Sequence, residues 1–209
     1  MADRVPLDFD PPVRMLRALL LGIDDGELAN TTPCPEWTVA TLLDHLMGLS
    51  VAFTQAAHKR VDGPGASGAP APSAQRLSRH WRSRLPVLLE DLATSWKDPA
   101  AWTGTSQAGG VTMPATALGH VAVNEVIMHS WDLARATGQE YFVDPRTVEV
   151  LIEFLAQFPA EGSPGLFGPA VPTDDEATLL DQALALAGRD ARWRPPRRRR
   201  AAEAGPAAA

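Results

Sequence analysis

Three polar side chains lie on the apolar stripe of one segment of this chain. In LGHVAVNEVIMHSWDLARATG, residues 118 to 138, apolar residues recur every three or four positions, and Glu125, His129 and Asp132 fall on the same face. A buried carboxylate is costly unless it is paired or bound to a metal, and the segment's arginine, Arg135, lies near its far end. Glu125 and His129 are four residues apart, so a helix projects them from one face one turn apart. This spacing suits two ligands of one metal ion.

A third candidate ligand comes from another helical segment. His45 lies three residues after Leu42 and four before Leu49, which places it beside these core positions. Two histidines and one carboxylate are a ligand set that an open catalytic zinc site uses, with the fourth position left for water or substrate. The alternative for such a histidine is a core residue bonded to a backbone carbonyl.

Other polar residues have competing interpretations. The carboxylate of Asp132 either accepts from the His129 ring nitrogen that faces away from the metal, or pairs with Arg135. His120 is turned away from Glu125 and His129 by its spacing. Cys34 is either a small buried residue or a reactive thiol. We expect the remaining two histidines on exposed helix flanks: His58 and His80.

Composition indicates one soluble domain. The chain has 209 residues, 45% hydrophobic and 21% charged, and no run approaches the roughly 18 apolar residues of a membrane span. No secretory signal is recognisable, so we expect a cytoplasmic protein. The net charge of −6 argues against general nucleic-acid affinity, and a single cysteine excludes an internal disulfide or a cysteine-rich zinc finger.

Periodicity and Gly/Pro punctuation predict six helices and a folded body over residues 1–191. A hairpin-like connection is expected around Gly109-Gly110, and Gly138 is placed to end the fourth helix. We expect residues 192–209, basic and then alanine-rich, to be a disordered tail, with a docking arm for nucleic acid as the weaker alternative. The expected helices span residues 12–28, 35–60, 74–96, 114–138, 145–159 and 174–187.

Three stretches resemble, in order and spacing, the signatures of the DinB-like metal-binding bundles related to mycothiol-dependent maleylpyruvate isomerase. They are TTPCPEWTVATLLDHLMGL, NEVIMHSWDLARATGQ and GLFGPAVPTDDEATLLDQALALAGRD. The resemblance spans residues 10 to 193 and implies an all-α fold, a four-helix bundle with up-down-down-up course, a long crossover and additional C-terminal helices. It also implies that zinc, or another divalent ion such as nickel or manganese, is bound by His45, Glu125 and His129.

The resemblance further implies a thiol-dependent activity. Characterised relatives use the metal to bind mycothiol or bacillithiol as co-substrate and to activate it as thiolate. In an isomerase, reversible thiolate addition to an activated double bond permits rotation before elimination. We therefore expect a mycothiol S-transferase or isomerase-like enzyme acting on a small electrophile, without nucleic-acid or membrane partners and with a homodimer as one possible assembly. The alternative is a non-catalytic metal- or ligand-binding bundle with a regulatory or stress role.

Overall fold

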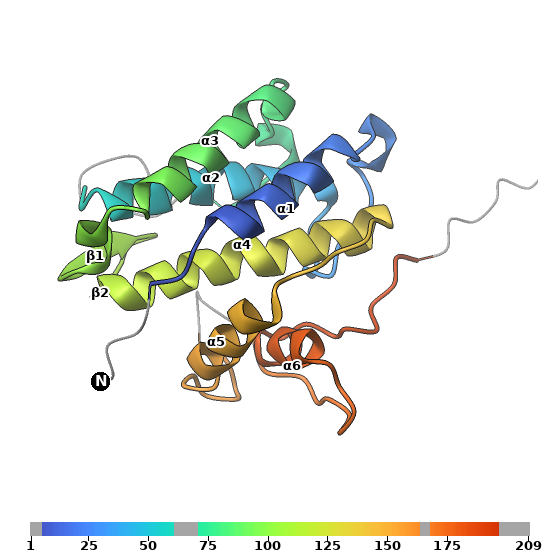
Figure 1. Ribbon diagram of the computed structural model, residues 1–209. Coiled ribbons are helices and arrows are strands. Elements are labelled where there is room, and N and C mark those ends of the chain that lie inside the picture. Colours follow the sequence, from blue (N-terminus) through green and yellow to red (C-terminus); the bar gives the residue numbers. More distant parts are fainter. Residues whose placement is uncertain (1–5, 61–70, 164–167, 197–209) are drawn as a thin grey trace, which may run out of the picture.

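The computed structural model describes residues 6–60, 71–163 and 168–196, and within them it is mainly helical (Figure 1). This confirms the all-α class expected from the sequence. Three short 3-10 helices and a two-stranded antiparallel hairpin complete the described part. The main elements are α1 (Asp10–Leu21), α2 (Val39–Ala57), α3 (Trp81–Ser95), β1 (Thr105–Ala108), β2 (Val111–Pro114), α4 (Ala115–Thr137), α5 (Pro145–Leu155) and α6 (Leu179–Leu186).

The first four helices form a bundle. α2 packs against α3 and α4, and α1 packs against the same two helices from the other side. In Figure 1, α1 and α4 run in one direction while α2 and α3 run in the other, which is the up-down-down-up course that the resemblance implied. α5 and α6 pack against each other, and α5 also contacts α4.

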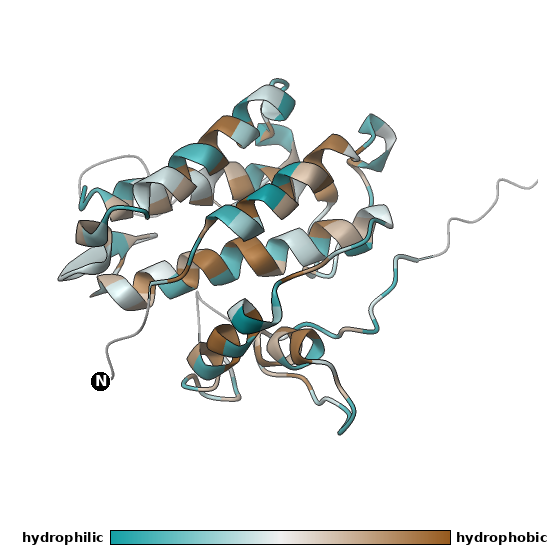
Figure 2. Ribbon diagram, in the orientation of Figure 1, coloured by the Kyte–Doolittle hydropathy of each residue, from teal (hydrophilic) through white to brown (hydrophobic). Residues whose placement is uncertain are grey.

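α4 is the central element, and it is buried on almost every side. The stripe predicted from periodicity is buried, but so are residues between its positions, such as Val123, Val126 and Ile127. Figure 2 shows hydrophobic residues recurring along α4 and on both α5 and α6. Because α5 covers a face of α4 that the other bundle helices leave open, α4 is apolar around its circumference rather than along one stripe.

Local capping chemistry moves several helix ends away from their expected positions. α2 begins at Val39 rather than near residue 35, because the Thr38 hydroxyl accepts the backbone N–H of Thr41 as an N-cap. The preceding turn holds Glu36 at a φ of 65°, which no helix allows. α6 begins at Leu179, because Thr178 and Asp181 form a capping box.

The segments expected as helices at residues 12–28 and 74–96 are shorter than expected. α1 ends at Leu21, and the chain then forms the 3-10 turn Asp25–Glu27. The residues before α3 contain a separate 3-10 turn, Ala74–Arg76. The glycine signals are confirmed: Gly138 ends α4 with a φ of 68°, and Gly109-Gly110 connects the two strands with φ of 59° and 81°.

Most of the tail expected to be disordered lies outside the described residues, since residues 197–209 are not described. None of the described helices is both long and apolar enough to cross a membrane.

Candidate metal centre and its cleft

The three predicted ligands meet between α2 and α4. Oε2 of Glu125 lies 3.3 Å from Nε2 of His45 and 3.1 Å from Nε2 of His129. A tetrahedral zinc ion with bonds of about 2.0–2.1 Å separates its ligand atoms by about 3.3 Å, so these two spacings suit such an ion, and all three ligand atoms lie within 4.8 Å of one another. The sequence interpretation required His45 to be level with the turn joining Glu125 to His129, and the packing of the two helices meets that requirement.

Asp132 accepts a hydrogen bond from the far side of the His129 ring. Its Oδ2 lies 2.9 Å from Nδ1 of His129, and the carboxyl side chain is fully buried. Of the two interpretations of Asp132, the structure therefore supports the bond to His129, whereas Arg135 donates to the backbone carbonyl of Trp193 at 2.7 Å. A carboxylate in this position holds Nδ1 protonated, so that Nε2 is the ring nitrogen that could bind a metal.

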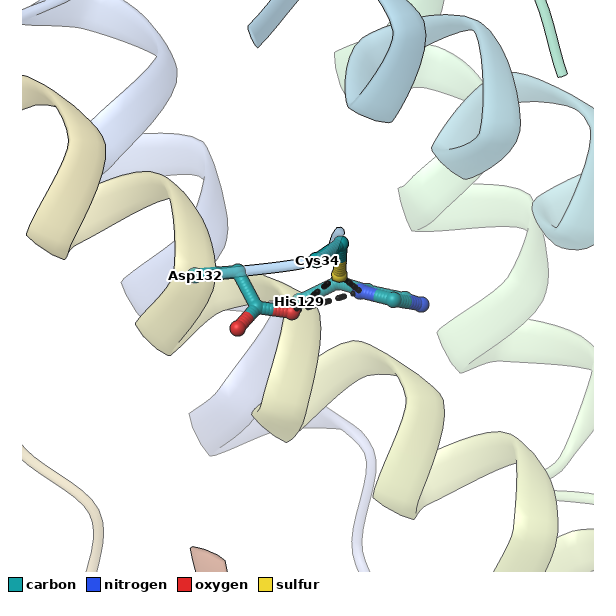
Figure 3. Close-up of side chains that lie close together, drawn as sticks. All are labelled: Cys34, His129 and Asp132. Atoms are coloured by element: carbon teal, nitrogen blue, oxygen red, sulfur yellow. Dashed lines mark hydrogen bonds and ion pairs between the residues drawn. The ribbon is translucent and has the colours of Figure 1, made fainter. Parts of the chain in front are cut away.

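The same carboxylate belongs to a second cluster with Cys34, from the loop before α2 (Figure 3). Sγ of Cys34 donates to Oδ2 of Asp132 at 3.1 Å and lies 3.8 Å from Nδ1 of His129. Arg189, which follows α6, approaches from another side, with Nη2 3.4 Å from the same Oδ2. His129 thus presents one nitrogen to each cluster, and the cysteine is part of the site rather than an isolated core residue.

Charges in the centre are arranged by burial and by hydrogen bonds. Burial alone raises the pKa of Glu125, but hydrogen bonds from His129 and His45 outweigh it and place that pKa well below its usual range. Burial disfavours the charged form of His129, yet its hydrogen bonds to Asp132, Cys34 and Glu125 raise its pKa well above normal. Burial keeps the pKa of His45 below normal. Without a metal, the proton shared between Glu125 and His129 therefore resides on His129.

The same surroundings shift the pKa values of Asp132 and Cys34 in opposite directions. Burial raises the pKa of Asp132, but the hydrogen bond from His129 and the charge of Arg189 bring it below its usual value. For the Cys34 thiol, burial dominates and raises the pKa, with only partial compensation from His129. The structure therefore favours a neutral thiol beside an ionised carboxylate in the metal-free protein.

The centre opens into a cleft of about 880 Å³. His45, Glu125 and His129 all line it, as do Cys34 and Arg189. His45 is only partly buried, with a quarter of its side chain exposed, because it faces this space. The ring of Trp37 also lines the cleft, with its centroid 5.0 Å from that of His45 and 6.0 Å from that of His129.

The other histidines lie where the spacing placed them. His120 is buried, and its Nδ1–H donates to the carbonyl of Thr116 at 2.7 Å, on a face of α4 away from the centre. His58 and His80 are exposed. Sequence reasoning did not place Cys34, Trp37 and Arg189 at the site, although all three lie within the stretches that carry the family resemblance: TTPCPEW and LAGRD.

An up-down-down-up bundle that brings two histidines and a glutamate together from its second and fourth helices defines a DinB-like helical bundle. Residues 10–134 match the family model of the mycothiol maleylpyruvate isomerase N-terminal domain, and the chain belongs to that family.

Known proteins similar to the chain extend this likeness beyond the matched domain. An uncharacterized protein of Mycobacterium tuberculosis is 28% identical over 181 residues, covering 84% of this chain and 92% of the relative, and the same match is found in a second strain. The crystal structure of mycothiol-dependent maleylpyruvate isomerase superposes with a TM-score of 0.63 at 19% identity, covering 87% of this chain and 86% of that one. A histidine-to-alanine mutant of that isomerase gives a TM-score of 0.62 at 18% identity, covering 86% of each chain. Likeness at this identity establishes the shared fold.

Proposed function

We propose that the chain is a mycothiol-dependent enzyme that holds a divalent metal ion, zinc in the first instance, through His45, Glu125 and His129. The activity is thiol transfer to a small electrophile, or isomerisation of one. The observation that carries the proposal is the convergence of the three ligand atoms, 3.1 Å and 3.3 Å apart around Oε2 of Glu125, at the wall of a cleft. An ion held there would supply Lewis acidity, which lowers the pKa of a bound thiol and makes it a nucleophile near neutral pH.

The ligand set favours an anionic sulfur. Two neutral imidazoles and one carboxylate carry a single negative charge, so they neutralise half the charge of a dication. The remaining positive charge lies in a partly buried site, where it attracts a thiolate more strongly than it would in water. Three protein ligands also leave one tetrahedral position for the co-substrate.

The neighbouring residues keep this set in one geometry. Asp132 fixes the tautomer and orientation of His129 through the hydrogen bond at Nδ1. Trp37 contacts both imidazole rings, stacked against His129 and tilted against His45, which restricts their rotation. Arg189 balances the charge of Asp132, so that the buried carboxylate does not disturb the net charge at the ligands.

Metal content and thiol uptake test the proposal. The purified protein should hold close to one equivalent of zinc, and His45→Ala should lose it, while His58→Ala, the same change at the C-terminal end of α2 and away from the centre, should retain it. Zinc-loaded protein should take up mycothiol in a titration that Glu125→Ala abolishes. Less than about a tenth of an equivalent of metal in the purified protein would count heavily against the proposal.

The same titration distinguishes the proposed enzyme from the alternative function. A zinc-loaded protein that takes up no thiol, or that binds mycothiol but transfers it to no electrophile, would be a metal- or ligand-binding bundle with a regulatory or stress role.

A further inference from the structure

The lining of the cleft becomes apolar with increasing distance from the candidate metal centre. On α4, Leu118 and Val121 line it on the same face as Glu125, towards the N-terminus of the helix. Seven residues of helix, from Leu118 to Glu125, span about 10 Å. α2 runs in the opposite direction, so Leu49 and Phe53 lie beyond His45 on the same side of the centre. Both helices therefore continue the cleft away from the metal ligands with apolar walls.

The β1–β2 hairpin borders that end of the cleft. Both strands pack against α4, and β1 also packs against α2. Val111 and Met113 on β2 line the cleft, while Thr112 between them points to the other side of the strand. We define the hairpin chamber as the apolar lining residues of this end: Leu49, Ala52, Phe53, Leu88, Ala108, Val111, Met113, Leu118 and Val121.

Charged residues of the cleft are either paired with another residue or exposed to water. Asp44 pairs with Arg76 at 3.2 Å, and Arg189 pairs with Asp132 at 3.4 Å. Arg84 also lines the cleft, one helical turn before Leu88 on α3, but it is exposed, where water screens its charge. A carboxylate placed in the chamber would lose its hydration without a buried cation beside it, whereas an apolar group would bury surface against apolar side chains.

We propose that the electrophile used by this protein is uncharged and carries an apolar aryl or alkyl body of up to about 10 Å, which the hairpin chamber holds beside the metal centre. This inference rests on the proposed function for its chemistry, since the electrophilic carbon has to lie at the centre. It separates the chain's substrate class from that of a small dicarboxylate such as maleylpyruvate. The hairpin is then the element that selects the substrate, because it supplies the far wall.

Binding of an uncharged fluorophore tests the chamber without relying on metal-dependent turnover. Phenylnaphthylamine should bind the full-length protein with increased fluorescence. Methyl hydrocinnamate should displace it at a concentration at least about tenfold lower than hydrocinnamate, which has the same body with a carboxylate in place of the ester. Equal displacement by ester and carboxylate would overturn the inference, as would displacement by mycothiol itself.

A matched pair of variants locates the binding in the chamber. Met113→Asp places a charge inside it and should weaken fluorophore binding at least about tenfold, whereas Thr112→Asp adds the same charge to the same strand on its outer side and should change binding less than about twofold. Equal effects would overturn the inference. Both positions are incompletely buried, and circular dichroism checks that each variant folds; should Met113→Asp unfold, Val111→Asp takes its place in the comparison.

Turnover distinguishes a failure of this inference from a failure of the proposed function. With zinc and mycothiol, benzylideneacetone, an uncharged aryl enone, should react faster than maleylpyruvate when each rate is divided by the uncatalysed rate. Preference for maleylpyruvate would overturn the inference while leaving thiol activation intact. If neither compound reacts but the ester and the variants behave as expected, the chamber stands and the proposed thiol chemistry fails.

Discussion

Replacing Asp132 by asparagine should weaken zinc binding without removing a ligand. Oδ2 of Asp132 accepts from His129, Cys34 and Arg189, so one buried carboxylate holds three partners. An amide of the same shape can still accept from the imidazole, but it lacks the charge that makes Nε2 a stronger donor to the metal. Loss of such a partner typically lowers metal affinity 10- to 100-fold, which corresponds to about 1.4–2.8 kcal/mol.

The orphaned carboxyl oxygen strengthens this expectation. Oδ1 of Asp132 is buried and has no hydrogen-bond partner among the described residues. An asparagine that keeps its oxygen towards His129 therefore buries an unpaired amide NH₂, while the opposite orientation turns that NH₂ towards Arg189. Either orientation costs free energy, and neither restores the original ligand geometry.

Zinc affinity is measured by competition with a chromophoric chelator, and circular dichroism verifies the fold. Asp44→Asn is the matched control: its carboxylate is adjacent to His45 in the sequence but pairs with Arg76 and not with an imidazole, so affinity should change less than about threefold. If Asp132→Asn binds zinc as tightly as the control, the Asp132–His129 hydrogen bond does not orient the ligand and the reasoning is refuted.

Three further outcomes follow from the same geometry. Cys34→Ala should retain zinc while His45→Ala loses it, as measured by metal analysis; the reverse result would place the metal in the cysteine cluster. Zinc affinity should increase with pH up to the raised pKa of His129, because the ion displaces a proton there. In the metal-free protein, the stability contributed by protonated His129 is present below about pH 6.5 and is lost as the pH rises through the raised pKa. A zinc affinity or a melting temperature that does not depend on pH would contradict this expectation. Gly138→Ala should destabilise the fold by about 1 kcal/mol in urea unfolding, because φ is 68° there, whereas Gly26→Ala, with open space around the added methyl group, should cost less.

The proximity of Glu125, His129 and His45 could be predicted from the sequence because all three residues lie on helices. In a helix, spacing determines which side chains share a face, so Glu125 and His129 were tied together by four residues and His45 was tied to its apolar neighbours. The unfavourable burial of a glutamate was the second signal. Periodicity could not show that helices α2 and α4 are neighbours at the right level, and the family resemblance carried that part.

Cys34 and Arg189 could not be placed in the same way, because loop geometry has no fixed period. The thiol reaches Asp132 through a turn whose shape depends on Glu36 at a positive φ and on the cap at Thr38. The guanidinium reaches the same carboxylate from the segment after α6, whose position depends on the packing of α5 and α6. Both placements result from tertiary contacts that no local pattern of the sequence expresses.

The two carboxylates within α4 are tolerated because each is paired from a different part of the chain. α2 supplies His45 to Glu125, and the segment after α6 supplies Arg189 to Asp132, while His129 lies between the two carboxylates. Removing any one partner leaves an uncompensated charge inside the bundle, which is more costly than never having buried the group. A bound dication would satisfy Glu125 and both imidazoles at once. The centre therefore couples the packing of α2 and of the C-terminal segment to the orientation of the three proposed metal ligands, and metal binding should stabilise the contacts of both with α4.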